Sequence, residues 1–148
     1  MGALPQPLIR KIEKGDFKTV AEITNKHFSY MSMTPSKIAA RISRGFFYFV
    51  AVVDGKIAGF VDIEVKEKQA RVIGLAVEDE FRGRGIGSAL IAKAVEFGGS
   101  AGKRAVYLTV RQSNMSAIKF YERQGFVVAR ELEKRGEGFY IMCRKLET

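Results

Sequence analysis

The pattern of apolar and polar residues first predicts a three-stranded antiparallel meander. Residues 46–53 are aromatic and β-branched, which is typical of a strand, and Asp54-Gly55 behind them is a strong signal for a two-residue hairpin turn. The returning strand is expected at about residues 56–65, where Gly59 indicates a bulge or a close backbone approach. After a polar turn, residues 72–77 are apolar apart from one glycine, which suits a strand that is covered on both faces.

The residues before this meander predict one more strand and two helices. Residues 8–12, with the sequence Leu-Ile-Arg-Lys-Ile, are interpreted as a short first strand. Asp16 is a good cap for a helix over residues 17–28, in which apolar side chains recur with helical spacing. Residues 36–44 are predicted to form a second short helix, and the segment between the two helices is expected to be irregular.

The second half of the chain is predicted to contain two helices and three strands. In order, they are a helix from Ile86 to about Gly98-Gly99, a strand at 105–110, a helix at 115–123, and strands at 126–133 and 139–146. Because a helix connects residues 72–77 to residues 105–110, these two strands should be parallel. Asn114 can cap the second helix, and Gly125 stands where a left-handed residue ends a helix.

A glycine-rich loop lies between the strand at 72–77 and the helix that follows. Residues 82–87 contain three glycines at alternate positions, which lets backbone N–H groups approach a ligand. These groups open a helix, so they are unpaired and lie at its positive end, which favours a phosphate or pyrophosphate. A P-loop is excluded because no lysine follows Gly87, and the dinucleotide fingerprint fails because its last glycine would fall at Ser88 or Leu90.

Composition narrows the remaining possibilities. The chain has 148 residues, so one domain over residues 1–148 is expected. Its net charge of +9 favours polyanionic partners, among them RNA or a ribosome, without naming one. Cys143 is the only cysteine and His27 the only histidine, so we expect no disulfide, no metal site and an ordinary helical role for His27.

The apolar runs are far shorter than the roughly 18–20 residues that a membrane span requires. Residues 1–7 lack a basic start followed by an apolar core, so no signal peptide is expected. The sequence therefore predicts a cytoplasmic protein without membrane contact.

Two motifs resemble those of the GNAT superfamily of acyl-CoA-dependent N-acetyltransferases. Arg82, Gly85 and Gly87 match its R/Q-x-x-G-x-G/A signature for the pyrophosphate of coenzyme A. Alone this pattern is short, and a purely structural glycine turn would also explain it. Residues 114–126 supply the second motif, N-x-x-A-x-x-F-Y-E-x-x-G-F, on the expected helix. The order of elements agrees with that superfamily from about residue 9 to residue 146.

The resemblance implies an α/β (α+β) fold with a mixed, mostly antiparallel sheet of six to seven strands and about four flanking helices. Its two central parallel strands should splay apart, with acetyl-CoA in the gap and no metal. The implied activity is acetyl transfer from acetyl-CoA to an amine of a small molecule, peptide or protein. The alternative is a non-catalytic module of the same fold that binds acetyl-CoA or RNA. A monomer or a homodimer is expected.

The resemblance also implies which residues bind the cofactor. They are Leu75, Ala76, Val77, Arg82, Gly83, Arg84, Gly85, Ile86, Gly87, Ser88, Asn114 and Tyr121. The backbone of residues 75–77 would pair with the pantetheine arm, and Tyr121 would stand near the sulfur and protonate the departing thiolate. For Tyr121, core packing on an amphipathic helix is the alternative.

The general base is less clear from the sequence. In the ribosomal-protein and N-terminal acetyltransferases of this superfamily, a glutamate stands in an L-E-V-R context, where this chain has Thr109. Two carboxylates, Glu64 and Asp62, share one face of a predicted strand. Glu64 is the first candidate for the replacement base and Asp62 the second. The alternative for both is a solvated carboxylate pair at a sheet edge.

The acceptor is also open. Tyr30, Met31 and Met33 either line its pocket or fill the core beneath a loop. Without a strong base, an α-amine is the preferred acceptor, since its pKa of about 7.7–8.0 is lower than the value of about 10.4 for lysine.

Overall fold

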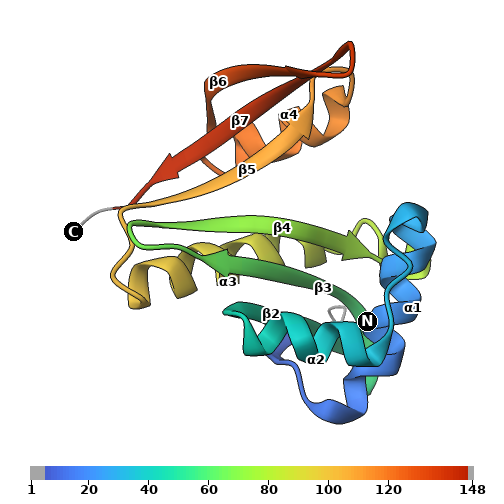
Figure 1. Ribbon diagram of the computed structural model, residues 1–148. Coiled ribbons are helices and arrows are strands. Elements are labelled where there is room, and N and C mark those ends of the chain that lie inside the picture. The colour runs from blue at the N-terminus through green and yellow to red at the C-terminus, as the bar shows by residue number, and fades with distance from the viewer. Residues whose placement is uncertain (1–5, 147–148) are drawn as a thin grey trace, which may run out of the picture.

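A computed structural model describes residues 6–146, so most of the N-terminal segment for which we expect no signal peptide lies outside it. Within that range the chain forms one seven-stranded sheet and four α-helices (Figure 1). The strands are β1 (Leu8–Lys11), β2 (Phe46–Val53), β3 (Lys56–Val65), β4 (Gln69–Val77), β5 (Ala105–Arg111), β6 (Val127–Lys134) and β7 (Glu137–Lys145). The α-helices are α1 (Phe17–His27), α2 (Pro35–Ser43), α3 (Ile86–Ser100) and α4 (Met115–Arg123). Short 3₁₀ turns occur at Lys14–Asp16, Ser29–Met31 and Asp79–Phe81.

The predicted meander is confirmed. The strand order in the sheet is β1-β2-β3-β4-β5-β7-β6, and β2, β3 and β4 are antiparallel neighbours. Asp54 and Gly55 both have positive φ, 50° and 75°, as the tight hairpin turn requires. Gly59 is a close-approach glycine, because a Cβ there would collide with the carbonyl oxygen of Ala76 on β4.

The two central parallel strands splay apart. β4 and β5 pair only from Gln69 to Arg71 on one strand and from Ala105 to Tyr107 on the other. Beyond these residues β5 continues with β7 and β6 as a separate leaf, and the gap between β4 and β5 widens (Figure 1). The expectation that residues 72–77 are covered on both faces is therefore wrong. Ile73, which lies beyond the residues paired with β5 and at a register shift between β3 and β4, is 42% exposed.

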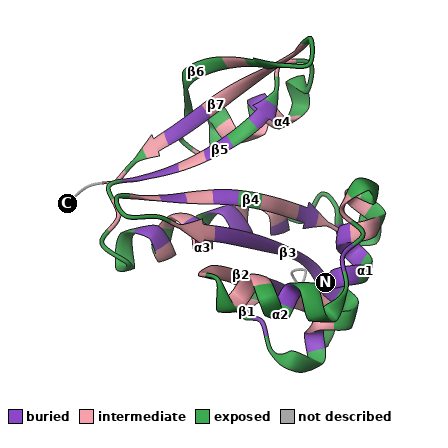
Figure 2. Ribbon diagram, in the orientation of Figure 1, coloured by how far each residue is buried: buried purple, intermediate pink, exposed green. Residues whose placement is uncertain are grey.

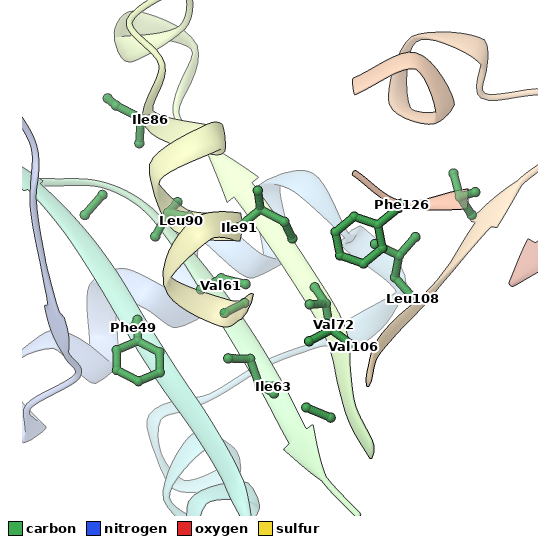
Figure 3. Close-up of a cluster of buried hydrophobic side chains, with 14 of the residues drawn as sticks. Phe49, Val61, Ile63, Val72, Ile86, Leu90, Ile91, Val106, Leu108 and Phe126 are labelled. Atoms are coloured by element: carbon green, nitrogen blue, oxygen red, sulfur yellow. The ribbon is translucent and has the colours of Figure 1, made fainter. Parts of the chain in front are cut away.

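Two apolar clusters hold the helices to the faces of the sheet. Helix α3 and α4 cover one face, where Leu90, Ile91, Val61 and Phe126 are among the buried residues (Figure 3). On the other face α1 and α2 pack against β2, β3 and β4 through residues such as Val20, Ile38 and Phe60. Strand β6, at the far edge, is mostly exposed (Figure 2). None of the described helices is long and apolar enough to cross a bilayer.

Several predicted boundaries need correction. Helix α3 runs through Gly98 and Gly99 to Ser100, since Gly98 packs tightly against β5: a Cβ there would lie 3.1 Å from Val106 Cγ2. Asp16 precedes α1 but does not cap it with its side chain, because its carboxylate instead accepts hydrogen bonds from Arg10 and the Glu13 N–H. The last turn is only Arg135-Gly136, both with positive φ, so β6 and β7 extend closer to the turn than predicted, to Lys134 and from Glu137.

Candidate active site

A groove of about 420 Å³ runs between β4 and α4, beyond the residues at which β5 pairs with β4. Its lining residues come from five parts of the chain and are His27, Leu75, Ala76, Val77, Arg82, Gly87, Asn114, Ser116, Ala117, Phe120 and Tyr121. Leu75, Ala76 and Val77 lie on β4 beyond its last residue paired with β5. That edge of β4 therefore has no strand partner within the described residues.

The glycine-rich loop forms one end of this groove. Gly83 and Gly85 have positive φ, 78° and 75°, and Gly85 is the residue immediately before α3. The first N–H groups of a helix have no partner inside it, so those of Ile86, Gly87 and Ser88 are available to an anion. The Ile86 side chain is buried beneath the helix, so only the backbone of this residue can contact a ligand.

The charged side chains of the loop are partly engaged elsewhere. Arg82 lines the groove and lies 3.0 Å from Asp79, an exposed pair. Arg84 stacks over the Phe81 ring at 5.4 Å from its centroid. The Ser88 hydroxyl accepts a hydrogen bond of 3.0 Å from the Gln124 amide, which ties α3 to the end of α4. Arg84 and Ser88, with Gly83, Gly85 and Ile86, are not among the lining residues of the groove.

Helix α4 brings Asn114 and Tyr121 to the opposite wall. The Asn114 side-chain oxygen accepts a 3.2 Å hydrogen bond from the Ala117 N–H, so the predicted cap is confirmed. This leaves the side-chain NH₂ group as the part of Asn114 that can donate to a ligand. Tyr121 contacts the rings of Phe120 and Phe126, with centroid distances of 5.2 and 5.9 Å. Burial raises the pKa of Tyr121 to about 12. The phenol is therefore fully protonated near neutral pH.

A second, smaller cavity of about 60 Å³ lies on the α1–α2 side of β4. Its lining is mostly apolar and consists of Thr24, Phe28, Tyr30, Met31, Met33, Arg41, Tyr48, Phe60, Asp62, Ile73 and Gly74. Ile73 and Gly74 directly precede Leu75 in β4, so the cavity and the groove adjoin along that strand. Tyr30, Met31 and Met33 all line this cavity, and Met33 is also buried in the core. That the cavity holds the acceptor stays a prediction.

One side of this cavity is an Arg–Asp–Tyr cluster in which Asp62 and Tyr48 are buried and Arg41 is partly exposed. Arg41 donates from Nη2 to Asp62 Oδ2 at 2.6 Å and from Nε to the Tyr48 hydroxyl at 2.9 Å. Burial raises the pKa of Asp62 to about 6, although Arg41 and a backbone hydrogen bond from Gly74 act in the opposite direction. The expectation of a solvated carboxylate is wrong for Asp62, which is 2% exposed because β3 lies inside the sheet beneath α2.

Glu64 lies elsewhere. It sits opposite Phe46 and Arg71 in the sheet, 3.3 Å from Lys66 Nζ, and lines neither the groove nor the cavity. The structure therefore does not bring Glu64 together with Tyr121 and the other predicted residues. Residue 64 lies two positions further along β3 than residue 62, and so further from the part of β4 that lines the groove.

His27 is a groove residue that the sequence interpretation treated as ordinary. It ends α1, lines the groove beside Leu75, and its Nε2 lies 3.3 Å from Glu78 Oε1. Lys26 Nζ lies 3.6 Å from the same oxygen. Glu78 follows β4 directly, so this pair joins the end of α1 to the end of β4. No local pattern could have found it, because Glu78 is 51 residues away in the sequence.

Comparison with known proteins supports this picture. Residues 14–126 match the model of the acetyltransferase (GNAT) family. An uncharacterized N-acetyltransferase of Methanocaldococcus jannaschii is 32% identical over 143 residues, which cover 93% of this chain and 91% of that protein. A second N-acetyltransferase of that organism is 43% identical over 86 residues, but the match spans 53% of this chain and only 38% of that protein. An N-alpha-acetyltransferase of Sulfurisphaera tokodaii is 31% identical, over 67% of this chain and 69% of its own length.

Solved structures show the same fold. Ard1 from Thermoplasma volcanium is 26% identical, with a TM-score of 0.82 over 97% of this chain and 100% of its own. PaiA N-acetyltransferase from Thermoplasma acidophilum, solved with coenzyme A, has a TM-score of 0.80 over 96% of this chain and 100% of its own. At 20% identity this likeness shows the fold alone. The predicted superfamily and its splayed sheet are confirmed, and the relatives favour an enzyme over a non-catalytic module. The chain therefore belongs to the acetyltransferase (GNAT) family and is an N-acetyltransferase.

Proposed function

We propose that this protein binds acetyl-CoA in the groove between β4 and α4 and transfers its acetyl group to an α-amine held in the cavity beside Asp62. The observation that carries the proposal is the loss of strand pairing on β4 after Arg71, next to the groove residues Leu75 to Val77. A free strand edge offers alternating N–H and C=O groups to an extended ligand. The pantetheine arm of coenzyme A, an extended chain with amide groups, suits that edge.

The beginning of α3 is assigned to the pyrophosphate. The N–H groups of residues 86–88 point out of the helix start, and the helix dipole favours negative charge there. Gly83 and Gly85 keep side chains away from the bound anion. Arg84 and Ser88 contribute through their backbones, because their side chains contact Phe81 and Gln124. Arg82 supplies a guanidinium at the edge of the groove, and the Asn114 amide donates to the cofactor from the other wall.

Tyr121 is assigned to the leaving group. In the reaction the amine nitrogen attacks the thioester carbonyl, a C–N bond forms and the C–S bond breaks. A backbone N–H on β4 stabilises the oxyanion that develops on the carbonyl oxygen. The Tyr121 phenol, which retains its proton near neutral pH, gives that proton to the departing thiolate.

Asp62, in place of Glu64, is assigned to the base. Its carboxylate lines the acceptor cavity beside Gly74, whereas Glu64 lines neither hollow. A pKa of about 6 leaves Asp62 mostly ionised at pH 7 and close to the range that suits proton transfer. It takes the proton that the amine loses on acetylation. Arg41 keeps the carboxylate in place through its 2.6 Å hydrogen bond.

The α-amine is favoured by two observations. The relative from Sulfurisphaera tokodaii is named an N-alpha-acetyltransferase. In addition, the base is a buried carboxylate paired with an arginine, which suits an amine that loses its proton easily.

The test combines binding and turnover. Calorimetry with acetyl-CoA measures cofactor binding, and release of the free thiol measures turnover over a panel of α-amines, lysine side chains and polyamines. We expect binding and thiol release, with the fastest release on α-amines. Binding without thiol release on any amine would support the non-catalytic module instead.

A further inference from the structure

A basic groove lies along α2, next to the acceptor cavity. This α2 groove is lined by Met31, Met33, Lys37, Ala40, Arg41 and Arg44 and has a volume of about 350 Å³. Residues 37, 40, 41 and 44 have the spacing of one helix face, so their side chains project together. The α2 groove contains three cationic side chains and no acidic one.

The α2 groove is continuous with the acceptor cavity. Met31, Met33 and Arg41 line both hollows. If the amine of an acceptor lies beside Asp62, the rest of the acceptor extends out of the cavity past Met31 and Met33 to the exposed face of α2. The cavity itself holds only about 60 Å³. Its mostly apolar wall and small volume suit a short apolar side chain.

The charges of this groove are not all compensated inside the protein. Arg41 is neutralised by Asp62 at 2.6 Å. Lys37 and Arg44 are exposed, and neither forms an ion pair with a carboxylate within the described residues. The Lys37 ammonium donates to the Ser32 carbonyl at 2.9 Å, which holds it at the rim of the groove. Two positive charges thus flank the exit of the cavity.

We propose that the acceptor is a peptide N-terminus with a short apolar first residue and acidic residues at about its second to fourth positions, which contact Lys37 and Arg44. This proposal rests on the proposed function and adds the substrate class. Lys37 lies in α2 and Arg44 directly follows its last residue, so the two are seven positions apart, or roughly 10 Å at 1.5 Å per residue of helix. An extended peptide covers that length with about three residues at 3.3 Å each. The two cations therefore match acidic side chains close to the acetylated residue.

The experiment compares three peptides that begin with alanine and continue with acidic, neutral or basic residues at positions two to four. Thiol release gives kcat/KM for each, and alanine amide serves as an acceptor too short to reach α2. Exposed ion pairs contribute little each, so we expect a roughly three- to tenfold preference for the acidic over the neutral peptide. The preference should appear in KM and should shrink as salt is added, since exposed charges are screened.

A double variant, Lys37→Glu with Arg44→Glu, should reverse the preference and leave turnover of alanine amide unchanged. The control is Arg130→Glu with Lys134→Glu, which makes the same change of net charge on β6. This strand lies at the opposite edge of the sheet from the strands that α2 covers. The control variant should keep the preference for the acidic peptide. Equal rates on all three peptides would overturn the proposed substrate class. Acetylation of alanine amide in the same assay would still support the proposed function. No acetylation of any acceptor would instead count against the proposed function itself. Loss of RNA binding in the first double variant, with peptide rates unchanged, would assign the α2 groove to nucleic acid and overturn the proposal.

Discussion

The carboxylate of Asp62 occupies the space that a side chain at residue 74 would need. A Cβ added to Gly74 would lie 2.6 Å from Asp62 Oδ1, which is too close for any real contact. Gly74 also lowers the pKa of the same carboxyl through a backbone hydrogen bond. Its φ is not in the left-handed region, so glycine is required here for space and not for backbone conformation. The small residue on β4 thus allows a carboxylate from β3 to reach the junction of the cavity and the groove.

Gly74→Ala should displace Asp62 and lower kcat by roughly 10²-fold, because small shifts of catalytic groups carry large costs in rate. The affinity for acetyl-CoA should change little, since residue 74 is not part of the groove lining. Gly99→Ala is the matched control, because nothing lies within 4 Å of a Cβ there and the residue is inside α3. Alanine at that helical position should keep full activity and stabilise the fold slightly. Unchanged kcat in Gly74→Ala would remove Asp62 from the reaction.

The pH dependence should identify Asp62. Because its pKa is about 6, kcat in the parent should rise as the pH increases through that value and the carboxyl loses its proton. Asp62→Asn should abolish this acidic limb and lower kcat by about 10²–10⁴-fold, the range for general acid–base catalysis. Glu64→Gln is the control on the same strand and should keep both the limb and the rate. Loss of the limb in Glu64→Gln alone would return the base to residue 64.

The same group should affect stability with a defined sign. The pKa of Asp62 is raised from 3.8 to about 6 in the folded protein, so between these values the folded state binds more protons than the unfolded state. The free energy of unfolding should therefore fall as the pH rises from about 4 to about 6. Urea titrations over this window should show that decline in the parent and a flatter profile in Asp62→Asn.

Tyr121→Phe should lower turnover by about 10²–10⁴-fold while the dissociation constant for acetyl-CoA stays within a few-fold. The ring remains and still packs against Phe120 and Phe126, so the groove keeps its shape. Tyr107→Phe is a matched control, because Tyr107 lies on β5, packs beside Cys143 and lines no part of the groove. Near-normal turnover in Tyr121→Phe would assign this residue to packing.

Gly87→Val should narrow the cofactor groove. A Cβ at residue 87 would lie 3.4 Å from Phe120 Cζ and 3.8 Å from Val77 Cγ2, so a larger side chain projects between the two walls. We expect the dissociation constant for acetyl-CoA to increase at least about tenfold, or about 1.4 kcal/mol. Gly99→Val in the same helix faces open space and serves as the control. Equal cofactor affinity in the two variants would contradict the assignment of this loop.

The sequence predicted the elements of the fold well, because its signals are local. Asp54-Gly55 marks a hairpin by its turn residues, and Asn114 marks a helix start by its cap. The end of α3 lies at Ser100, just beyond the predicted Gly98-Gly99. Gly98 is there for close packing on β5, a contact between residues that are distant in the sequence.

Part of the predicted site does gather in the structure, because Leu75 to Val77, Arg82, Gly87, Asn114 and Tyr121 all line the groove. Their roles toward the cofactor stay predictions. The base could not be chosen from the sequence. Asp62 and Glu64 share one strand face, and only the tertiary structure shows that Arg41 and Gly74 surround the first while Lys66 pairs with the second. His27 was missed for the same reason, since Glu78 is 51 residues away in the sequence.

The last prediction concerns the acceptor amine. At pH 7 roughly a tenth of α-amines with a pKa near 7.7–8.0 are neutral, against less than about a thousandth of lysine side chains. Thr109 stands where the resemblance to N-terminal acetyltransferases would place a glutamate, and the proposed base, Asp62, is already paired with Arg41. The protein therefore gains most from an acceptor that loses its proton easily, and kcat/KM should be higher for an α-amine than for an ε-amine on matched peptides.

The measurement is a pH–rate profile on the two acceptors, with Asp62→Asn and Glu64→Gln beside the parent. The advantage of the α-amine should be largest near pH 7 and should shrink toward pH 10, where lysine side chains also become neutral. Asp62→Asn should slow both acceptors and leave their order unchanged. A preference for the ε-amine that disappears in Glu64→Gln would overturn this prediction, because it would show a base on β3 that deprotonates lysine without help from Asp62.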